Sequence, residues 1–390
     1  MNDHPRITFV AASMTASSFL RQQAALLVDA GAQVEVVCGP PMPADYPCDV
    51  RVVDRLERDP SPVGDLAALV AMVRHFRKNR PDVLHASTPK AAMLALVAGA
   101  VTRVPRRVYL VRGLRLQTSS GLARRAMWTL ERLACRLAHD VVVVSPSLGD
   151  ELVAERIVPR DRVRMIGAGA SNGVDTGRFR PPTDQERLDA RARFGIADDE
   201  FAVVYVGRVN VDKGLPTLID ALRQIGGTRP VRILLVGEAE GSDAWKHTVK
   251  GWEQLPGVTC TGSLGDVWPA YAASDAAVLP TRREGLPNMV LEASASGLPV
   301  LVTDAVGARD ALVDGVTGIQ FPVDDATALA TAIVELCDRP DRGRSLGAAG
   351  RAWVSEHFEM RDVVVRNAHF LFPAMNRGNT DVRNLRHDAA

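Results

Sequence analysis

The feature that most constrains this chain is an alternation of short apolar runs with helical patterns, repeated on both sides of one break. The first half has apolar runs at 7–11, 34–38, 82–85, 107–111 and 141–145. The second half has them at 202–206, 232–236, 258–261, 276–279 and 300–303. Such runs, separated by helices, are typical of buried parallel strands. The sequence therefore predicts α/β sheets of the doubly wound type.

The break lies at residues 167–182, which read GAGASNGVDTGRFRPP. Glycine, asparagine and proline at this density indicate a linker. The 390 residues are enough for two domains of ordinary size, so we expect one over 1–172 and another over 173–352. We expect amphipathic helices over 353–375, crossing back to the first domain, and a polar tail over 376–390.

Composition excludes several classes of protein. The formal net charge is +1, which gives no reason to expect a nucleic-acid partner. The five cysteines are scattered, without a CxxC or Cys/His cluster, so neither a zinc site nor a disulfide framework is predicted. No signal-peptide pattern opens the chain, and the apolar run 91–101 is too short to span a bilayer. We therefore expect a cytoplasmic protein that could meet a membrane only from the surface.

A first cationic motif follows the apolar run 202–206. Gly207-Arg208 and Asp212-Lys213-Gly214 place two cations and two glycines at a strand-to-helix turn. In open parallel sheets, ligands bind beyond the carboxyl ends of the strands. An arginine fork and a lysine ammonium at such a place suit phosphate oxygens. A solvated charged turn is the alternative interpretation of these residues alone.

A second motif, REGLPN, follows the apolar run 276–279, and a helix is predicted from Asn288 to about Ser296. Amides at the start of this helix, together with its dipole, would form a phosphate site. Glu284 precedes the helix and Glu292 lies within it, flanked by apolar residues. A partly buried carboxylate needs a polar partner, and sugar or ribose hydroxyls are suitable ones.

Together these residues resemble the retaining glycosyltransferases of family 4. The two glutamates of that family, separated by seven residues, match Glu284 and Glu292, and its phosphate-binding turn matches GRV-x-x-DKG. Val236-Gly237, Thr261-Gly262-Ser263 and Asn172–Asp175 follow in the family's order. The resemblance implies a GT-B fold, with two Rossmann-like domains facing a cleft.

The resemblance also assigns roles. The donor is a nucleoside diphosphate sugar, expected to carry UDP, and it is a substrate, so no cofactor is implied. Arg208 and Lys213 would hold its diphosphate, Glu284 the sugar hydroxyls and Glu292 the ribose. The cations would replace a metal ion, since the sequence has no D-x-D motif. The remaining donor contacts would come from Gly207, Gly262, Ser263, Leu264, Gly285, Leu286, Pro287, Asn288 and Met289.

The acceptor is expected in the first domain. His85, Thr88 and Lys90 form the pattern HxxTPK after the run 82–85, which resembles the family branch that extends polyprenyl-diphosphate-linked sugars for bacterial surface polysaccharides. A capped helix start at Thr88-Pro89 is the structural alternative. That branch usually has His-Gly after the next strand, whereas this chain has Arg112-Gly113. Small hydroxyl residues, among them Ser17, replace the usual glycine-rich first loop.

A basic block covers Val101–Arg136, with nine arginines and one acid, Glu131, a local charge of nine minus one, or +8. The pattern of residues 121–138, which overlaps the end of this block, predicts an amphipathic helix with arginines and a tryptophan. An interfacial helix in peripheral contact with an anionic membrane and an ordinary helix with a solvated basic face remain alternatives.

Three other functions compete with this interpretation. A transferase with a soluble small-molecule or natural-product acceptor would keep the same donor site. A GT-B sugar-nucleotide epimerase is disfavoured by the spacing of Glu284 and Glu292. A non-catalytic homologue would be expected to lack Arg208, Lys213 or Glu284, and all three are present.

Overall fold

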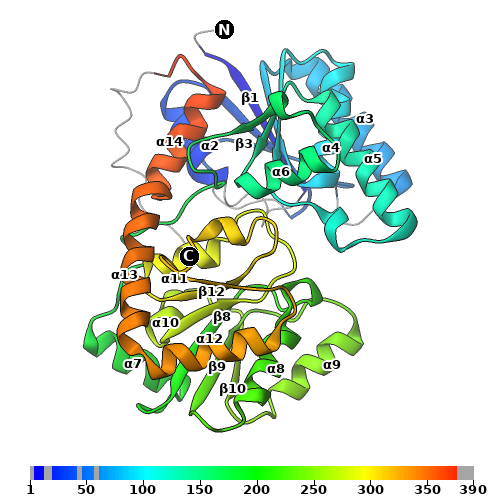
Figure 1. Cartoon of the computed structure of the whole chain (residues 1–390). Coiled ribbons are helices and arrows are strands. Elements are labelled where there is room, and N and C mark those ends of the chain that lie inside the picture. The colour runs from blue at the N-terminus through cyan, green and yellow to red at the C-terminus, as the bar shows by residue number, and fades with distance from the viewer. Residues whose placement is uncertain (1–3, 13–19, 42–45, 57–60, 376–390) are drawn as a thin grey trace. The chain divides into compact units, whose positions relative to one another are not determined.

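The computed structural model describes residues 4–12, 20–41, 46–56 and 61–375. The chain divides into two compact units, which are both drawn in Figure 1. The first unit contains the chain up to Asn172 and again from Arg361. The second unit contains Gly173–Met360. Each unit has its own sheet and its own covering helices.

The sheet of the first unit is parallel throughout, in the order β3-β2-β1-β4-β5-β6-β7. β4 is buried along its whole length, because it lies in the middle of this order. The strands are β1 (Arg6–Ala11), β2 (Gln33–Cys38), β3 (Asp49–Val52), β4 (Val83–Ser87), β5 (Arg106–Val111), β6 (Asp140–Val143) and β7 (Val163–Met165).

Helices α3 and α5 both pack against α4, the most apolar helix of this unit. The C-terminal α14 joins the same unit because the Arg106 guanidinium lies 4.6 Å from the ring centroid of Phe370 and donates to its carbonyl oxygen at 2.7 Å. The helices are α2 (Arg21–Asp29), α3 (Pro62–Asn79), α4 (Pro89–Val101), α5 (Gly121–Leu137), α6 (Pro146–Ala154) and α14 (Met360–Leu371), with short 3₁₀ turns η2 (Arg115–Thr118) and η3 (Arg160–Arg162).

The sheet of the second unit is also parallel, in the order β10-β9-β8-β11-β12-β13. Its strands are β8 (Phe201–Val206), β9 (Val231–Val236), β10 (Val258–Gly262), β11 (Ala276–Leu279), β12 (Val300–Thr303) and β13 (Ile319–Phe321). Its helices are α7 (Asp184–Phe194), α8 (Leu215–Ile225), α9 (Asp243–Trp252), α10 (Trp268–Ala272), α11 (Asn288–Ala295), α12 (Ala326–Asp338) and α13 (Pro340–His357), with 3₁₀ turns η4 (Val211–Lys213) and η5 (Arg309–Ala311).

All ten predicted strands are confirmed, and three strands were missed. β3, β7 and β13 are only three or four residues long and lie at sheet edges, where most of each strand is exposed or half-buried. Such strands lack the continuous apolar run by which buried strands are recognised. The second domain was expected to end at residue 352, but the second unit extends to Met360. α13 begins at Pro340, packs on α11 and continues to His357 inside the second unit, so the first unit resumes only at Arg361.

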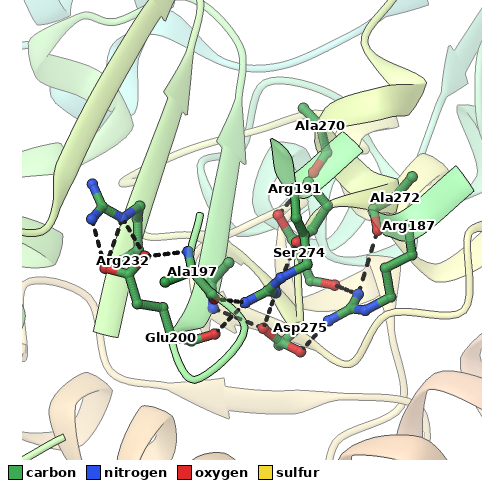
Figure 2. A network of polar contacts seen from close by, with 11 residues as sticks. Arg187, Arg191, Ala197, Glu200, Arg232, Ala270, Ala272, Ser274 and Asp275 are labelled. Carbon is green, nitrogen blue, oxygen red and sulfur yellow. Dashed lines mark hydrogen bonds and ion pairs between the residues drawn. The ribbon is translucent and has the colours of Figure 1, made fainter. Parts of the chain in front are cut away.

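The amino ends of the central strands are tied by a polar network around Asp275, which precedes β11 (Figure 2). One carboxylate oxygen of Asp275 accepts from Arg187 of α7 at 2.6 Å. The other accepts from the backbone amide of Ala202 in β8 at 2.8 Å and from Arg191 of α7 at 3.2 Å. The network therefore joins α7 to both central strands.

Arg191 is the most buried charged residue of this network, at 5% exposure. Its guanidinium also donates to the carbonyl oxygens of Ala273 and Glu200, at 3.2 and 2.7 Å. The Glu200 carboxylate in turn pairs with Arg232 of β9 at 2.6 Å. A buried charge with this many partners is compensated at its position, so we assign the network a structural role.

Candidate nucleotide-sugar site

Both predicted motifs, the cationic turn at 207–214 and the segment REGLPN at 283–288, lie at the carboxyl ends of the central strands of the second unit. Gly207-Arg208 follows β8, and the segment 281–288 follows β11. Because β8 and β11 pair in parallel, the two segments leave the same edge of the sheet. The amide of Arg282 donates to the Asp212 carbonyl oxygen at 3.0 Å, which joins the turn after β8 to the loop after β11.

Gly214 makes this approach possible. Its φ is +65°, and a Cβ at this position would lie 1.8 Å from the Pro280 carbonyl oxygen. No other residue fits without moving the backbone of the neighbouring loop. The glycine of the DKG triplet thus brings Lys213 to the loop that carries Glu284.

Two ion pairs cross between the motifs. Lys213 pairs with Glu284, and these side chains are 18% and 16% exposed. Arg283 pairs with Asp212 at 2.5 Å. The predicted residues Lys213 and Glu284 are therefore brought together, whereas the supporting pair was not predicted. Asp212 lies in the quoted motif, but only the fold reveals its partner.

Arg208 points to a different carboxylate. Its guanidinium pairs with Glu240, which follows β9, at 2.7 Å, and both side chains are nearly half exposed. The Tyr205 hydroxyl donates to the Arg208 carbonyl oxygen at 2.8 Å. Burial and the nearby Glu284 carboxylate raise the pKa of Tyr205. Tyr205 thus lies beside both the Arg208 backbone and Glu284, and it supports the turn between them.

Glu292 lies on α11 and is half-buried. It accepts a hydrogen bond from the Tyr271 hydroxyl of α10 at 2.9 Å. Burial raises the pKa of Glu292, and the Tyr271 hydrogen bond opposes that rise. A partner for Glu292 was expected, but its identity was not, because Tyr271 is 21 residues away in sequence.

The other predicted donor residues frame the same edge. Gly285, Pro287 and Met289 are buried, Leu286 is half-buried and Asn288 is exposed at the start of α11. Gly307, which no motif indicated, packs behind them. Its φ is +79°, and a Cβ there would lie 2.3 Å from the Glu284 carbonyl oxygen. A glycine in the loop after β12 is therefore needed to hold the loop that carries Glu284.

Gly262, Ser263 and Leu264 lie where β10 ends. The Ser263 amide donates to the Glu238 carboxylate at 3.1 Å, and Glu238 follows β9. The segment is half-buried at Gly262 and Leu264 and exposed at Ser263. The segment lies at the same sheet edge as the cationic turn at 207–214 and the segment REGLPN at 283–288.

In the first unit, His85 is buried in β4, and its ring lies edge-on to Phe9 with 5.1 Å between centroids. Burial lowers the pKa of His85 to about 4, so the ring is neutral at physiological pH. Thr88 precedes α4 with φ +70°, and its hydroxyl accepts from the Ala12 amide at 3.2 Å. The expected cap by the Thr88 side chain is absent, since that hydroxyl makes no hydrogen bond to the first turn of α4.

Lys90 and Arg112 also have protein partners. Lys90, in the first turn of α4, pairs with Asp65 of α3 at 2.5 Å. Arg112 follows β5 and donates to the Ser171 hydroxyl at 3.0 Å, and burial lowers the pKa of Arg112 to about 10. Arg112 therefore remains cationic at neutral pH. Ser17 lies outside the described residues.

The described residues lack two features, a cluster of metal ligands and a membrane-spanning helix. Across the described part of the chain, no group of three or more His, Cys, Asp or Glu side chains is placed to hold a metal ion. Within the same residues, no helix has the length and apolarity needed to cross a bilayer.

Both halves of the chain match known family models. Residues 15–169 match the glycosyl transferase 4-like domain, and residues 200–339 match glycosyl transferases group 1. Capsular polysaccharide biosynthesis glycosyltransferase CapM of Staphylococcus aureus is 30% identical over 315 residues, or 80% of this chain and 82% of that protein. Sulfoquinovosyl transferase SQD2 of Arabidopsis thaliana is 28% identical over 73% of this chain and 56% of its own length.

Solved structures share the fold. Sucrose-phosphate synthase from Thermosynechococcus elongatus gives a TM-score of 0.80 at 24% identity, over 95% of this chain and 100% of that one. Anabaena HepE in complex with UDP-glucose gives 0.77 at 20% identity, over 94% and 99% of the two chains. Identities this low bear on the fold alone. Two Rossmann-like units with parallel sheets constitute the GT-B fold that the sequence predicted.

Proposed function

This chain belongs to the group 1 glycosyltransferases, and we propose that it extends a polyprenyl-diphosphate-linked saccharide during surface polysaccharide synthesis. The donor is a nucleoside diphosphate sugar, with UDP as the nucleotide and a hexose or N-acetylhexosamine as the sugar. Transfer retains the anomeric configuration and needs no metal ion. The enzyme works in the cytoplasm, at the inner face of the membrane.

The observation that carries the donor site is the meeting of Lys213 and Glu284 through the close approach at Gly214. A lysine and a carboxylate that meet across two loops can each contact one part of a ligand that has both phosphate oxygens and hydroxyls. Lys213 then neutralises the diphosphate together with Arg208, and Glu284 accepts from sugar hydroxyls. Glu292, with its raised pKa, accepts from the ribose.

The reaction breaks the bond between the anomeric carbon and the diphosphate oxygen and forms one from that carbon to the acceptor oxygen. Negative charge develops on the leaving diphosphate, where fixed cations contribute most to catalysis. The leaving phosphate oxygen takes the acceptor's proton. No protein base is then required, and the two cations supply the charge stabilisation that a metal ion would otherwise give.

The acceptor is assigned to the first unit by the pattern HxxTPK. Lys90 lies where α4 begins, and Arg112 lies where β5 ends. The relative CapM acts, by its name, in capsular polysaccharide biosynthesis, and a lipid-linked saccharide with a diphosphate fits cations at that edge. A small-molecule acceptor without lipid is the competing proposal.

Contact with an anionic membrane is proposed for the outer face of α5. Leu122, Leu130 and Leu133 are 82%, 47% and 40% exposed, and Arg125 and Arg136 are exposed on the same helix. Apolar and basic side chains on one face are typical of interfacial helices.

Two other arginines of α5 do not contribute to this face. Arg124 pairs with Glu155 at 2.6 Å, and Arg132 lies 4.9 Å from the ring centroid of Trp128. The basic block is therefore less available to a membrane than its sequence suggested.

Mass spectrometry of reaction products tests the proposed function. A panel of nucleotide sugars is offered with a polyprenyl diphosphate N-acetylhexosamine and, separately, with the same sugar without lipid or phosphate. We expect a product of one added sugar on the lipid-linked acceptor only, with a UDP-sugar as the preferred donor. Efficient transfer to the lipid-free sugar would favour the small-molecule acceptor, and no transfer from any donor would refute the proposal.

A further inference from the structure

A cavity of about 230 Å³ lies in the first unit between α3, the start of α4, the 3₁₀ turn η2 and α5. Its walls are mainly apolar, formed by Met93, Leu94, Leu116, Met127 and Leu130. Leu94 and Leu116 are buried, whereas Leu130 is 47% exposed. The cavity therefore has a buried apolar floor and opens toward the outer face of α5.

The apolar lining continues beyond the opening. Leu133, one turn further along α5, is 40% exposed, and Leu122 near the start of that helix is 82% exposed. Contiguous exposed apolar surface on a protein of this kind usually indicates a binding surface. Two methionines in the wall add adaptability, because an unbranched thioether chain can repack around ligands of irregular shape.

Two cations lie at the cavity next to this apolar wall. Lys90 and Arg115 both contribute to the lining, and Lys90 is held by Asp65 at 2.5 Å. The other acid of the lining, Glu131, is buried and accepts from the Tyr109 hydroxyl at 2.7 Å. Its carboxylate is thus bound inside the protein. The combination suits an apolar chain that ends in an anionic group.

We propose that this cavity holds the first isoprene units of the acceptor lipid, with Lys90 and Arg115 on its phosphate. The proposal rests on the lipid-linked acceptor of the proposed function and adds a site for the lipid. The cations give the charge complementarity, and the exposed leucines of α5 give the rest of the chain a path to the bilayer. A cavity of roughly 150 Å³ holds one benzene molecule, so this one admits about one or two five-carbon units.

The test compares binding of farnesyl diphosphate and methyl diphosphate to the full chain by calorimetry. We expect farnesyl diphosphate to bind at least about tenfold more tightly, since each buried methylene contributes about 0.8 kcal/mol. Met127→Trp fills the cavity and should abolish this preference. Val70→Trp adds bulk at an exposed position of α3 that lies outside the lining and outside the leucine surface of α5, and it should leave the preference unchanged. Met93→Phe, from α4, provides a second filled variant should Met127→Trp fail to fold.

Three binding results would overturn the proposal: equal affinity for the two diphosphates in the wild type, an unchanged preference in a folded filled variant, or equal binding of dihexanoyl phosphatidic acid, which would make the occupant a membrane phospholipid. UDP binding by the second unit is measured in parallel and should be the same in all variants. Equal rates of sugar transfer to a farnesyl-linked and a methyl-linked acceptor would refute the lipid site alone. Absence of transfer to every acceptor would refute the proposed function instead.

Discussion

The two ends of the central strands in the second unit use similar residues in opposite ways. At the amino ends, Asp275 joins Arg187 and Arg191 with bonds to backbone groups on every side. At the carboxyl ends, Lys213 and Glu284 pair across two loops that meet at glycines. The first arrangement connects helix to sheet, whereas the second connects only the loops that a ligand would contact.

On the proposed donor site, this difference separates ion pairs that concern stability from ion pairs that concern function. Arg191 is almost completely buried and cannot be rehydrated without opening the unit. Lys213 and Glu284 keep some exposure and can change partners when a ligand arrives. Substitutions at the two ends should therefore separate the free energy of unfolding from turnover.

The largest effect is expected from Lys213→Ala. Turnover should fall roughly 10²–10³-fold, because one cation is lost beside the leaving diphosphate. The free energy of unfolding should fall by only about 1–2 kcal/mol, through loss of the partner of Glu284. Lys250→Ala, at an exposed position of α9, is the control and should change neither. Near-normal turnover in folded Lys213→Ala would place the diphosphate elsewhere.

The opposite result is expected from Asp275→Ala. Urea unfolding should show a loss of about 3 kcal/mol, because Arg191 stays buried without its carboxylate partner. Turnover per folded molecule should stay at the wild-type level. Asp220→Ala breaks an exposed pair with Arg223 and should cost less than about 0.5 kcal/mol. Equal losses in the two variants would refute the structural role of the network.

A smaller, pH-dependent effect is expected from Glu292→Gln. Burial raises the pKa of Glu292, so the folded state holds its proton more tightly than the unfolded state does. Stability from this group is thus largest at low pH and is lost as pH rises through the raised pKa.

Unfolding curves measured from pH 4 to pH 8 check this sign. As pH rises, the free energy of unfolding of the wild type should fall relative to that of the Glu292→Gln variant, because the glutamine has no proton to lose. The Michaelis constant for the donor should rise about tenfold, since one hydrogen bond to a charged group is lost. A difference that stays constant with pH, or an unchanged Michaelis constant, would contradict this role for Glu292.

The smallest effect is expected from metal removal. Turnover in excess EDTA should equal turnover without it, because Arg208 and Lys213 supply the positive charge at the diphosphate. Loss of activity in chelator that magnesium or manganese restores would show that these two cations are insufficient.

The sequence predicted that the two motifs of the second unit lie together because their signals are local. GRV-x-x-DKG and the two glutamates each lie within one loop and one helix start, and parallel α/β topology brings such loops to one edge. Two contacts could not be predicted, because each joins residues of different loops or helices. They are the ion pair between Asp212 and Arg283 and the hydrogen bond between Tyr271 and Glu292. Gly307 was missed because a close approach of two loops leaves no pattern around a single glycine.

The acceptor side was harder to predict for a related reason. Its pattern gave Thr88 and Lys90, but the cavity beside them is formed by four elements that are distant in sequence. The basic block was also misleading in part. A count of arginines cannot tell that Arg124 and Arg132 turn toward Glu155 and Trp128 while Arg125 and Arg136 face outward.

Calorimetric titration with UDP and UMP tests the central claim, that the carboxyl edge of the second sheet binds the donor through Arg208 and Lys213. The wild type should bind UDP at least about tenfold more tightly than UMP, because the second phosphate meets two cations and a hydrogen bond to a charged group contributes about 1.5–3 kcal/mol. In the double variant Arg208→Gln, Lys213→Met, this preference should disappear while UMP binding remains. GDP and GMP provide the same comparison for the other nucleotide. A wild type that binds diphosphate and monophosphate equally, or a double variant that keeps the preference, would contradict the account.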